Sequence, residues 1–167
     1  MDYHERQTIN FGEINREGGE GVCFTILQIL QDEDAGIYTW KCPGVFGEYA
    51  EAEEYIKEKL GLQLNEKSWA HTADEKNYYH IERVKLLGSI KDVRYALLDN
   101  FADGRAPWIS HVSSSADELK NLVITGEGTG HTWMDDTPEE FEAYVYEEGG
   151  FTAGAILRTQ YQGKPLD

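Results

Sequence analysis

The sequence predicts an α+β fold, a single domain on a mostly antiparallel sheet of about six to seven strands. Two longer helices, at about residues 48–60 and 138–148, and one short helix, at about 116–124, complete it. Three observations support this prediction. A length of 167 residues suits one domain. Hydrophobic residues at 40% and aromatic residues at 12% are enough for a packed core. Short alternating segments separated by turn signals outnumber the helical segments.

The chain is predicted to begin with an arm and then a β-hairpin. Residues 1–21 are polar and glycine-rich, which predicts a flexible arm or edge strand before a domain formed by residues 22–167. Residues 22–30 and 37–42 are rich in β-branched and aromatic side chains, and the polar turn QDEDAG separates them. Pro43-Gly44 is expected to end the second of these strands.

The two cysteines, Cys23 and Cys42, both fall on this predicted hairpin. No C-x-x-C motif accompanies them, and cysteine is commonly a small buried residue. We therefore expect reduced, buried thiols, as in a cytoplasmic protein.

The first longer helix, residues 48–60, ends at Gly61, a residue typical of helix C-caps. One stripe of this helix is apolar and is expected to face the core: Tyr49, Ala52, Ile56 and Leu60. Four strands are predicted to follow, at residues 62–70, 78–87, 92–98 and 107–112, and a last one at residues 154–161.

Two capping boxes predict the other helices. Ser115 and Glu118 frame the start of the short helix at residues 116–124. The sequence Thr-Pro-Glu-Glu at residues 137–140 opens the second longer helix, with proline at its first position. That helix is expected to end at Gly149.

The distribution of charge is the strongest functional signal. The chain has 31 acidic residues against 15 lysines and arginines, a net charge of −16. Residues 1–65 carry −8 and residues 121–167 carry −7, whereas residues 66–120 carry only −1. Such a charge repels nucleic acids and anionic membranes and steers association toward basic surfaces. We therefore expect no direct nucleic-acid binding and no membrane association.

Each longer helix places one tyrosine among clustered acids. Glutamates meet lysine and arginine, and tyrosine adds rigid contact area at low entropic cost. This pattern favours a surface for a basic protein partner, one that itself binds nucleic acid. Solubility alone also explains acidic helices, and that interpretation stays open. The predicted partner-binding residues are Glu51, Glu54, Tyr55, Glu58, Asp135, Asp136, Glu139, Glu142, Tyr146 and Glu147.

In size and charge the chain resembles small acidic inhibitors encoded by phages and mobile elements, antirestriction and anti-CRISPR proteins among them. The likeness is one of composition, without any of their sequence motifs, and it assigns no family. The leading hypothesis is a non-enzymatic inhibitor that blocks a basic nucleic-acid-binding site as a DNA mimic. A further hypothesis is an acidic housekeeping or immunity-type domain whose partner has no connection with DNA.

The nearly neutral middle of the chain provides the alternative hypothesis, a small enzyme or sensor. Basic and tyrosine side chains on predicted strands would bind a small anionic, nucleotide-like metabolite. The ligand-binding candidates are Arg83, Lys85, Arg94 and Tyr95, and the proton-transfer candidates are His80, Glu82 and His111. These basic residues could equally pair with the acidic flanks or form a self-association surface, and both interpretations stay open.

No motif specifies a metal, a cofactor or a catalytic triad. His131, Asp135 and Asp136 match neither an EF-hand nor H-E-x-x-H, and we expect no metal. The glycine-rich residues 126–130 lack the Lys-Ser/Thr of a P-loop. The sequence contains no apolar run of 18 residues and no visible secretory signal, which favours the cytoplasm.

Overall fold

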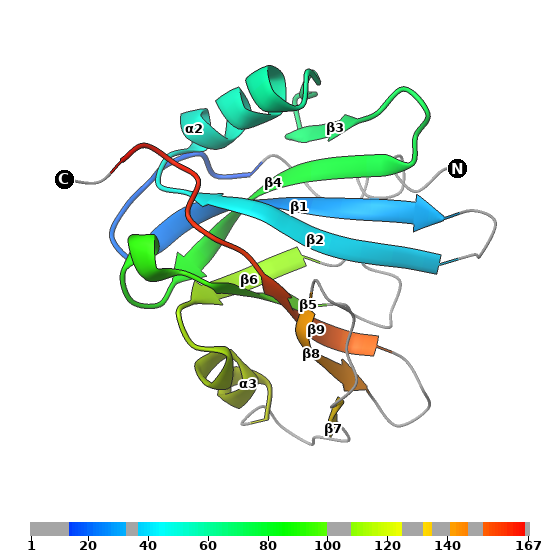
Figure 1. The fold of residues 1–167 in the computed structure, drawn as a ribbon. Helices are drawn as coiled ribbons and strands as arrows, with labels where there is room; N and C mark the ends of the chain where they lie inside the picture. Colours follow the sequence, from blue (N-terminus) through cyan, green and yellow to red (C-terminus); the bar gives the residue numbers. More distant parts are fainter. Residues whose placement is uncertain are drawn as a thin grey trace.

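The architecture is a curled sheet with helices on its outer faces (Figure 1). The structure, a computed structural model, describes residues 14–32, 37–99, 108–124, 132–134, 141–146 and 152–165. The strands in these ranges are β1 (Val22–Asp32), β2 (Ile37–Phe46), β3 (Trp69–His71), β4 (Asn77–Leu86), β5 (Tyr95–Asp99), β6 (Trp108–Ser113), β7 (Thr132–Met134), β8 (Phe141–Tyr146) and β9 (Thr152–Arg158). The helices are α2 (Tyr49–Glu54), its π-helical continuation η1 (Tyr55–Lys59), the 3-10 turn η2 (Ile90–Asp92) and α3 (Ala116–Ile124).

The strands follow the order β2-β1-β4-β6-β5-β9-β8-β7, and β3 pairs with β4 outside this path. Among the described strands, every pair is antiparallel except β4 and β6, which are parallel. The mixed α/β architecture with a largely antiparallel sheet therefore agrees with the sequence prediction, and the strands outnumber the six or seven expected.

The sheet curls until β2 meets the segment that follows β9. The Val45 N–H donates a hydrogen bond to the Gln160 carbonyl at 3.0 Å, and the Gln162 N–H donates to the Val45 carbonyl at 2.9 Å. A parallel bridge joins Val45 to Tyr161. The strands β2, β1, β4, β6, β5 and β9 thus enclose an interior, and β8 and β7 extend the sheet beyond β9.

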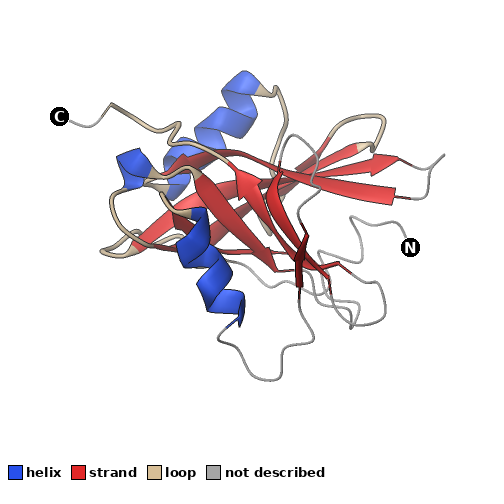
Figure 2. Ribbon diagram, turned by 60° about the horizontal axis from the view of Figure 1, so that its bottom comes forward, coloured by secondary structure: helices blue, strands red, loops and turns tan. Residues whose placement is uncertain are grey.

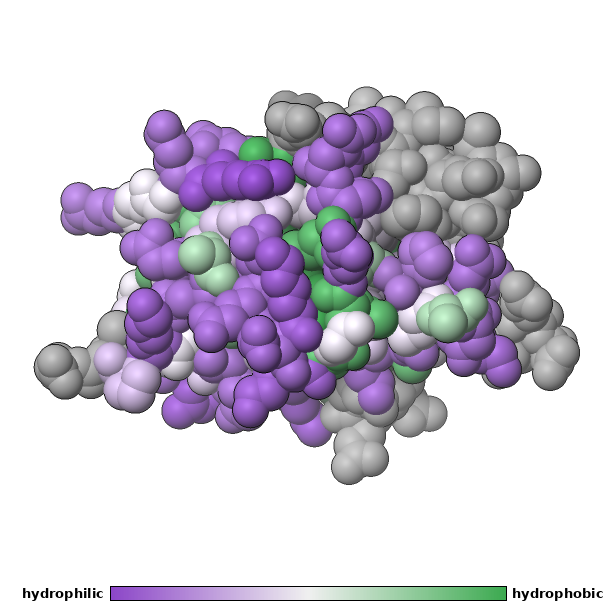
Figure 3. Space-filling view, turned by 90° about the horizontal axis from the view of Figure 1, so that it is seen from above, coloured by the Kyte–Doolittle hydropathy of each residue, from purple (hydrophilic) through white to green (hydrophobic). Residues whose placement is uncertain are grey.

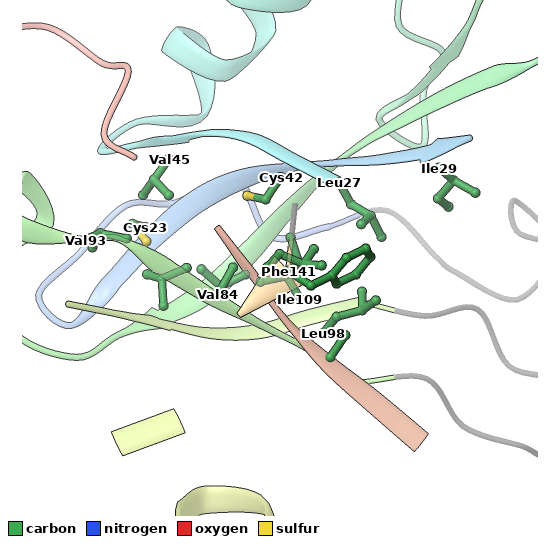
Figure 4. Packing of buried hydrophobic residues seen from close by; sticks show 14 of the residues in the cluster. Cys23, Leu27, Ile29, Cys42, Val45, Val84, Val93, Leu98, Ile109 and Phe141 are labelled. Carbon is green, nitrogen blue, oxygen red and sulfur yellow. The ribbon is translucent and has the colours of Figure 1, made fainter. Parts of the chain in front are cut away.

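Apolar side chains fill this interior (Figure 4). Because side chains alternate along a strand, every second residue of each enclosing strand points inward. The buried cluster includes Cys23, Leu27, Ile29, Cys42, Val45, Val84, Leu98, Ile109, Phe141 and Leu157. This cluster is the main core of the protein.

Two smaller clusters attach the helices to the outside of the sheet (Figures 1 and 2). Helix α2 and η1 cover β1, β2 and β4, with Ala52 and Ile56 buried among Phe24, Phe46 and Ile81. Helix α3 covers β5 and β9 through a cluster of three buried side chains, Leu97, Leu119 and Ile156. Figure 3 shows the face that carries α2 as mostly hydrophilic, with a hydrophobic patch near its centre.

The structure confirms the predicted helices at residues 48–60 and 116–124, which correspond to α2 with η1 and to α3. The apolar stripe of the first helix faces the core as expected. The predicted helix at residues 138–148 is wrong where the structure describes it, because Phe141–Tyr146 is strand β8. Strand β8 pairs with β9 on one edge and β7 on the other, and Phe141 is buried in the core. Its capping box and its ends lie outside the described residues.

Two predicted strand boundaries are also wrong. Strand β2 continues through Pro43 and Gly44 to Phe46, and a register shift opposite Ile26–Gln28 of β1 accommodates this irregularity. A Cβ at Gly44 would lie 2.8 Å from Cγ of Gln162, so glycine permits the close approach of the segment that closes the sheet. Of the strand expected at residues 62–70, only Trp69 and Ala70 belong to β3.

Residues 14–21 cross the outer face of β4. Nε of Arg83 donates a hydrogen bond to the Glu17 carbonyl at 3.0 Å, and the guanidinium of Arg16 lies 4.7 Å from the ring centre of Tyr49. Residues 1–13 of the predicted arm lie outside the described residues.

Candidate functional site

The parallel strands β4 and β6 pair over only two residues and then diverge. Lys85 lies opposite His111 and Leu86 lies opposite Val112. Further back along the same edge of β4, residues 78–80 pair with β3 instead. Residues 82–84, between these two partners, have no ladder partner on this edge among the described strands. The sheet is therefore interrupted at this point.

A cavity of about 860 Å³ opens at this interruption. Its volume is within the range of small-molecule sites, roughly 300–1,000 Å³. Both strands line it, and Ile14, Asn15 and Gly21 of the segment before β1 complete its wall. We call it the β4–β6 cavity.

Glu82 is the most unusual residue of this cavity. Its side chain is only 6% exposed, and its Oε1 accepts a hydrogen bond from the Ile109 N–H at 3.2 Å. The carboxyl group thus replaces the missing ladder contact between β4 and β6. No hydrogen bond joins Oε2 to any other described residue. Burial raises the pKa of Glu82 well above its ordinary value, and the hydrogen bond from Ile109 opposes this only in part.

Thr25 lies directly opposite Glu82 in the β1–β4 register. Cross-strand neighbours of this kind have Cβ atoms about 5 Å apart. The Thr25 side chain is fully buried, and its Oγ1 has no hydrogen-bond partner in the described structure. A buried hydroxyl group without a hydrogen-bond partner therefore lies beside Glu82 in the interior.

His80 lies two residues before Glu82 on the same face of β4 and is 2% exposed. Its ring stacks on Trp69, with ring centres 4.3 Å apart and an interplanar angle of 18°. Burial lowers the pKa of His80 to about 3, against the opposing effect of a hydrogen bond to the Lys67 carbonyl. The imidazole is therefore neutral at neutral pH.

The rim of the cavity carries two basic side chains and one acidic side chain, half-buried Asp99. Arg83 and Lys85 are exposed, and His111 is half-buried beside Lys85 in the β4–β6 register. Nδ1 of His111 lies 2.9 Å from Oγ of Ser110. Burial and the neighbouring Lys85 charge both lower the pKa of His111. The cavity thus combines a buried carboxyl group and a neutral imidazole inside with two cationic side chains and Asp99 at its rim.

Five of the seven residues of the alternative sequence hypothesis line this one cavity: His80, Glu82, Arg83, Lys85 and His111. Arg94 and Tyr95 do not line it. The Arg94 guanidinium donates to the Val93 carbonyl at 2.8 Å, and half-buried Tyr95 packs with the cluster under α3.

Sequence reasoning missed Asp99, Trp108 and Ser110, which also line the cavity. They come from the last residue of β5 and the first three residues of β6, and no local pattern indicates that these residues lie near β4. The tryptophan was the one available signal, because aromatic residues are enriched in ligand sites.

The acidic residues of α2 and η1 line a second, smaller cavity of about 250 Å³, here called the acidic groove. Its lining consists of Phe46, Glu51, Glu54, Tyr55, Glu58, Lys59 and residues 162–164. Oε2 of Glu51 accepts a hydrogen bond from the Lys164 N–H at 2.7 Å, so this acid holds the C-terminal segment. Tyr55 is half-buried, with its ring centre 5.5 Å from that of Phe46. Packing against Phe46 therefore covers part of the Tyr55 side chain.

The second predicted acidic surface is not helical over its described residues. Glu142 lies on strand β8 and pairs with Arg158 of β9 at 3.4 Å. Tyr146 is the last residue of the same strand. The other members of this predicted surface lie outside the described residues: Asp135, Asp136, Glu139 and Glu147.

The cysteines are buried, free thiols in the main core. Burial raises the pKa of Cys23 to about 12, with a contribution from Cys42. Burial likewise raises the pKa of Cys42 to about 12. Neither thiol is therefore a reactive thiolate at neutral pH.

Comparisons with protein-family models, with curated protein sequences and with solved structures found no match to this chain. Within the described ranges, no group of three or more His, Cys, Asp or Glu side chains is placed to hold a metal ion. The helices seen in those ranges are all too short or too polar to cross a membrane.

Proposed function

We propose that the protein binds a small anionic metabolite in the β4–β6 cavity. The observation that carries this proposal is the convergence of five ionisable side chains from two strands on one cavity, with Glu82 buried at its wall. Buried polar groups are normally satisfied, so a buried carboxyl group with a single hydrogen bond in the wall of a cavity indicates a place for a ligand atom.

The basic rim supports an anionic ligand. Lys85 and Arg83 are exposed cations in a chain whose net charge is −16, so the rim is a local exception to the acidic surface. These two cations favour the approach of an anion to this cavity over the strongly acidic parts of the surface. Trp108 is half-buried and lines the cavity, where its aromatic surface can pack against a ring of the ligand.

Calorimetric titration with nucleoside monophosphates and small organic acids tests the proposal. Lys85→Ala should weaken the binding of the best ligand about tenfold, the loss expected for one charged hydrogen bond. Arg94→Ala is the matched control, because it removes an exposed cation that does not line the cavity. Equal weakening by both variants, or no binding across the panel, would refute the proposal.

A second candidate function is suggested by the acidic groove. Four of the predicted partner-binding residues, Glu51, Glu54, Tyr55 and Glu58, line this one depression. The lining holds three glutamates against two lysines, Lys59 and Lys164, so a hollow with a tyrosine ring and an excess of acids favours a lysine or arginine side chain of a basic protein partner. An inhibitor of a nucleic-acid-binding protein would use such a surface.

Charge reversal tests this second candidate. Glu54→Lys with Glu58→Lys should abolish a salt-sensitive interaction with a basic partner captured from the host lysate, while the fold survives. Glu20→Lys with Glu66→Lys is the control, because both of these glutamates are exposed and neither lines the groove. Equal capture by both double variants would exclude the groove as the binding surface.

A further inference from the structure

The unengaged oxygen of Glu82 defines the ligand more narrowly than the basic rim does. Oε1 already accepts the Ile109 N–H, and Glu82 is one of the residues that line the β4–β6 cavity. Glu82 takes part in no ion pair with a described residue. Arg83 and Lys85 lie on the opposite face of β4, because side chains alternate along the strand.

A buried carboxylate without a cationic partner is costly, so the neutral acid is the favoured form. A protonated carboxyl group has one O–H donor and keeps an acceptor oxygen. With Oε1 as the acceptor for Ile109, the O–H lies at Oε2 and needs an acceptor. The raised pKa of Glu82 agrees with this assignment.

We infer that the ligand carries a neutral carbonyl oxygen, which accepts a hydrogen bond from Oε2 of Glu82, and an anionic group that reaches Lys85 and His111. This inference rests on the proposed small-molecule function.

The spacing along β4 sets the length of the ligand. Glu82 and Lys85 are three residues apart, roughly 10 Å along a strand, and their side chains lie on opposite faces of β4. Both line the β4–β6 cavity, so a ligand that contacts both extends through the interruption of the sheet, with the carbonyl and the anion at opposite ends of about one ring. Ring-containing organic anions with a carbonyl, nucleotides of oxo-bases among them, meet this requirement.

Two benzoates provide a matched pair of probes. In 4-acetylbenzoate a ketone lies opposite the carboxylate, and in 4-isopropenylbenzoate a methylene group of the same planar shape replaces the ketone oxygen. Titrations followed by amide chemical shifts should show about fivefold to tenfold tighter binding of the acetyl compound, the contribution of one hydrogen bond. The shifts also report whether each variant is folded.

The variants identify the donor. Glu82→Gln keeps an acceptor for Ile109 and offers an N–H donor, so it should retain the preference for the acetyl compound. Glu82→Met removes both functions and should bind the two probes equally. Equal binding of the probes to the wild-type protein, or loss of the preference in Glu82→Gln, would overturn the inference and leave the proposed function intact.

The two proposals fail in different ways. If neither benzoate binds while a nucleotide or organic acid of the first panel does, the ligand class inferred from Glu82 is wrong and the cavity still binds anions. If no anion binds at all, the proposed function itself is wrong, and the inference is refuted with it.

Discussion

Replacing His80 should remove a large part of the acid sensitivity of this protein. Its imidazole is buried and stacked on Trp69, and its pKa is lowered to about 3 in the folded state. In the unfolded chain histidine titrates near 6.5. Below pH 6.5 the unfolded chain therefore gains a proton that the folded chain does not bind. The free energy of unfolding should fall as pH decreases toward 3.

The size of this effect follows from the two pKa values. Each pH unit below the pKa of the unfolded state corresponds to about 1.4 kcal/mol. Lowering the pH from about 7.5 to 5 should therefore reduce the free energy of unfolding by about 2 kcal/mol through His80 alone. His80→Phe keeps an aromatic ring against Trp69, and His80→Gln does not. Neither variant can be protonated at this position.

Urea denaturation of the wild-type protein and both variants at each pH measures the effect. At pH 7.5 the free energy of unfolding of His80→Phe should exceed that of His80→Gln by about 1 kcal/mol, the contribution of an aromatic pair. As the pH falls to 5, the free energy of unfolding of each variant should rise by about 2 kcal/mol relative to that of the wild type. A constant difference from the wild type over this range would refute the conclusion that His80 is held neutral.

Three further predictions concern other buried groups. Because the pKa of Glu82 is raised, the unfolded chain loses this proton above pH 4.5 while the folded chain keeps it, and wild-type stability declines as pH rises. Glu82→Gln should therefore gain stability relative to the wild type by about 1.4 kcal/mol per pH unit up to the folded pKa, measured by urea denaturation. Gly154→Ala should lower the melting temperature, since its Cβ would lie 2.8 Å from the Leu98 carbonyl oxygen, and an unchanged melting temperature would contradict this packing. Cys23 and Cys42 should react with a thiol reagent only after unfolding, and rapid reaction of the native protein would show that they are accessible.

Local patterns in the sequence were sufficient for the helices and strands whose signals extend over many residues. The stripe of the helix at residues 48–60 and the capping box of the helix at residues 116–124 required no tertiary information. Residues 141–146 (FEAYVY) were ambiguous, because Phe141 and Val145 lie on one face of a helix and also on one face of a strand. The vacant edge of β9 decides in favour of a strand, and this edge is a property of the assembled sheet.

The candidate site was also predictable only in part. His80 and Glu82 alternate along one strand, so the sequence alone places them on one face. Their position at a cavity with His111 depends on the parallel pairing of β4 with β6, and no local pattern predicts this pairing. The sequence around Arg94 did not indicate that its guanidinium binds the main-chain carbonyls of Lys91 and Val93 and does not line the cavity.

The closure of the sheet has a consequence for synthesis in the cell. Val45 pairs with Tyr161, which is made 116 residues later. At about 5–20 residues per second, a ribosome needs roughly 6–23 s to cover that interval. During this time β1, β2 and β4 can pair, but one edge of β2 and the apolar interior stay uncovered. The nascent chain therefore has a period of exposure in which chaperones have access to it.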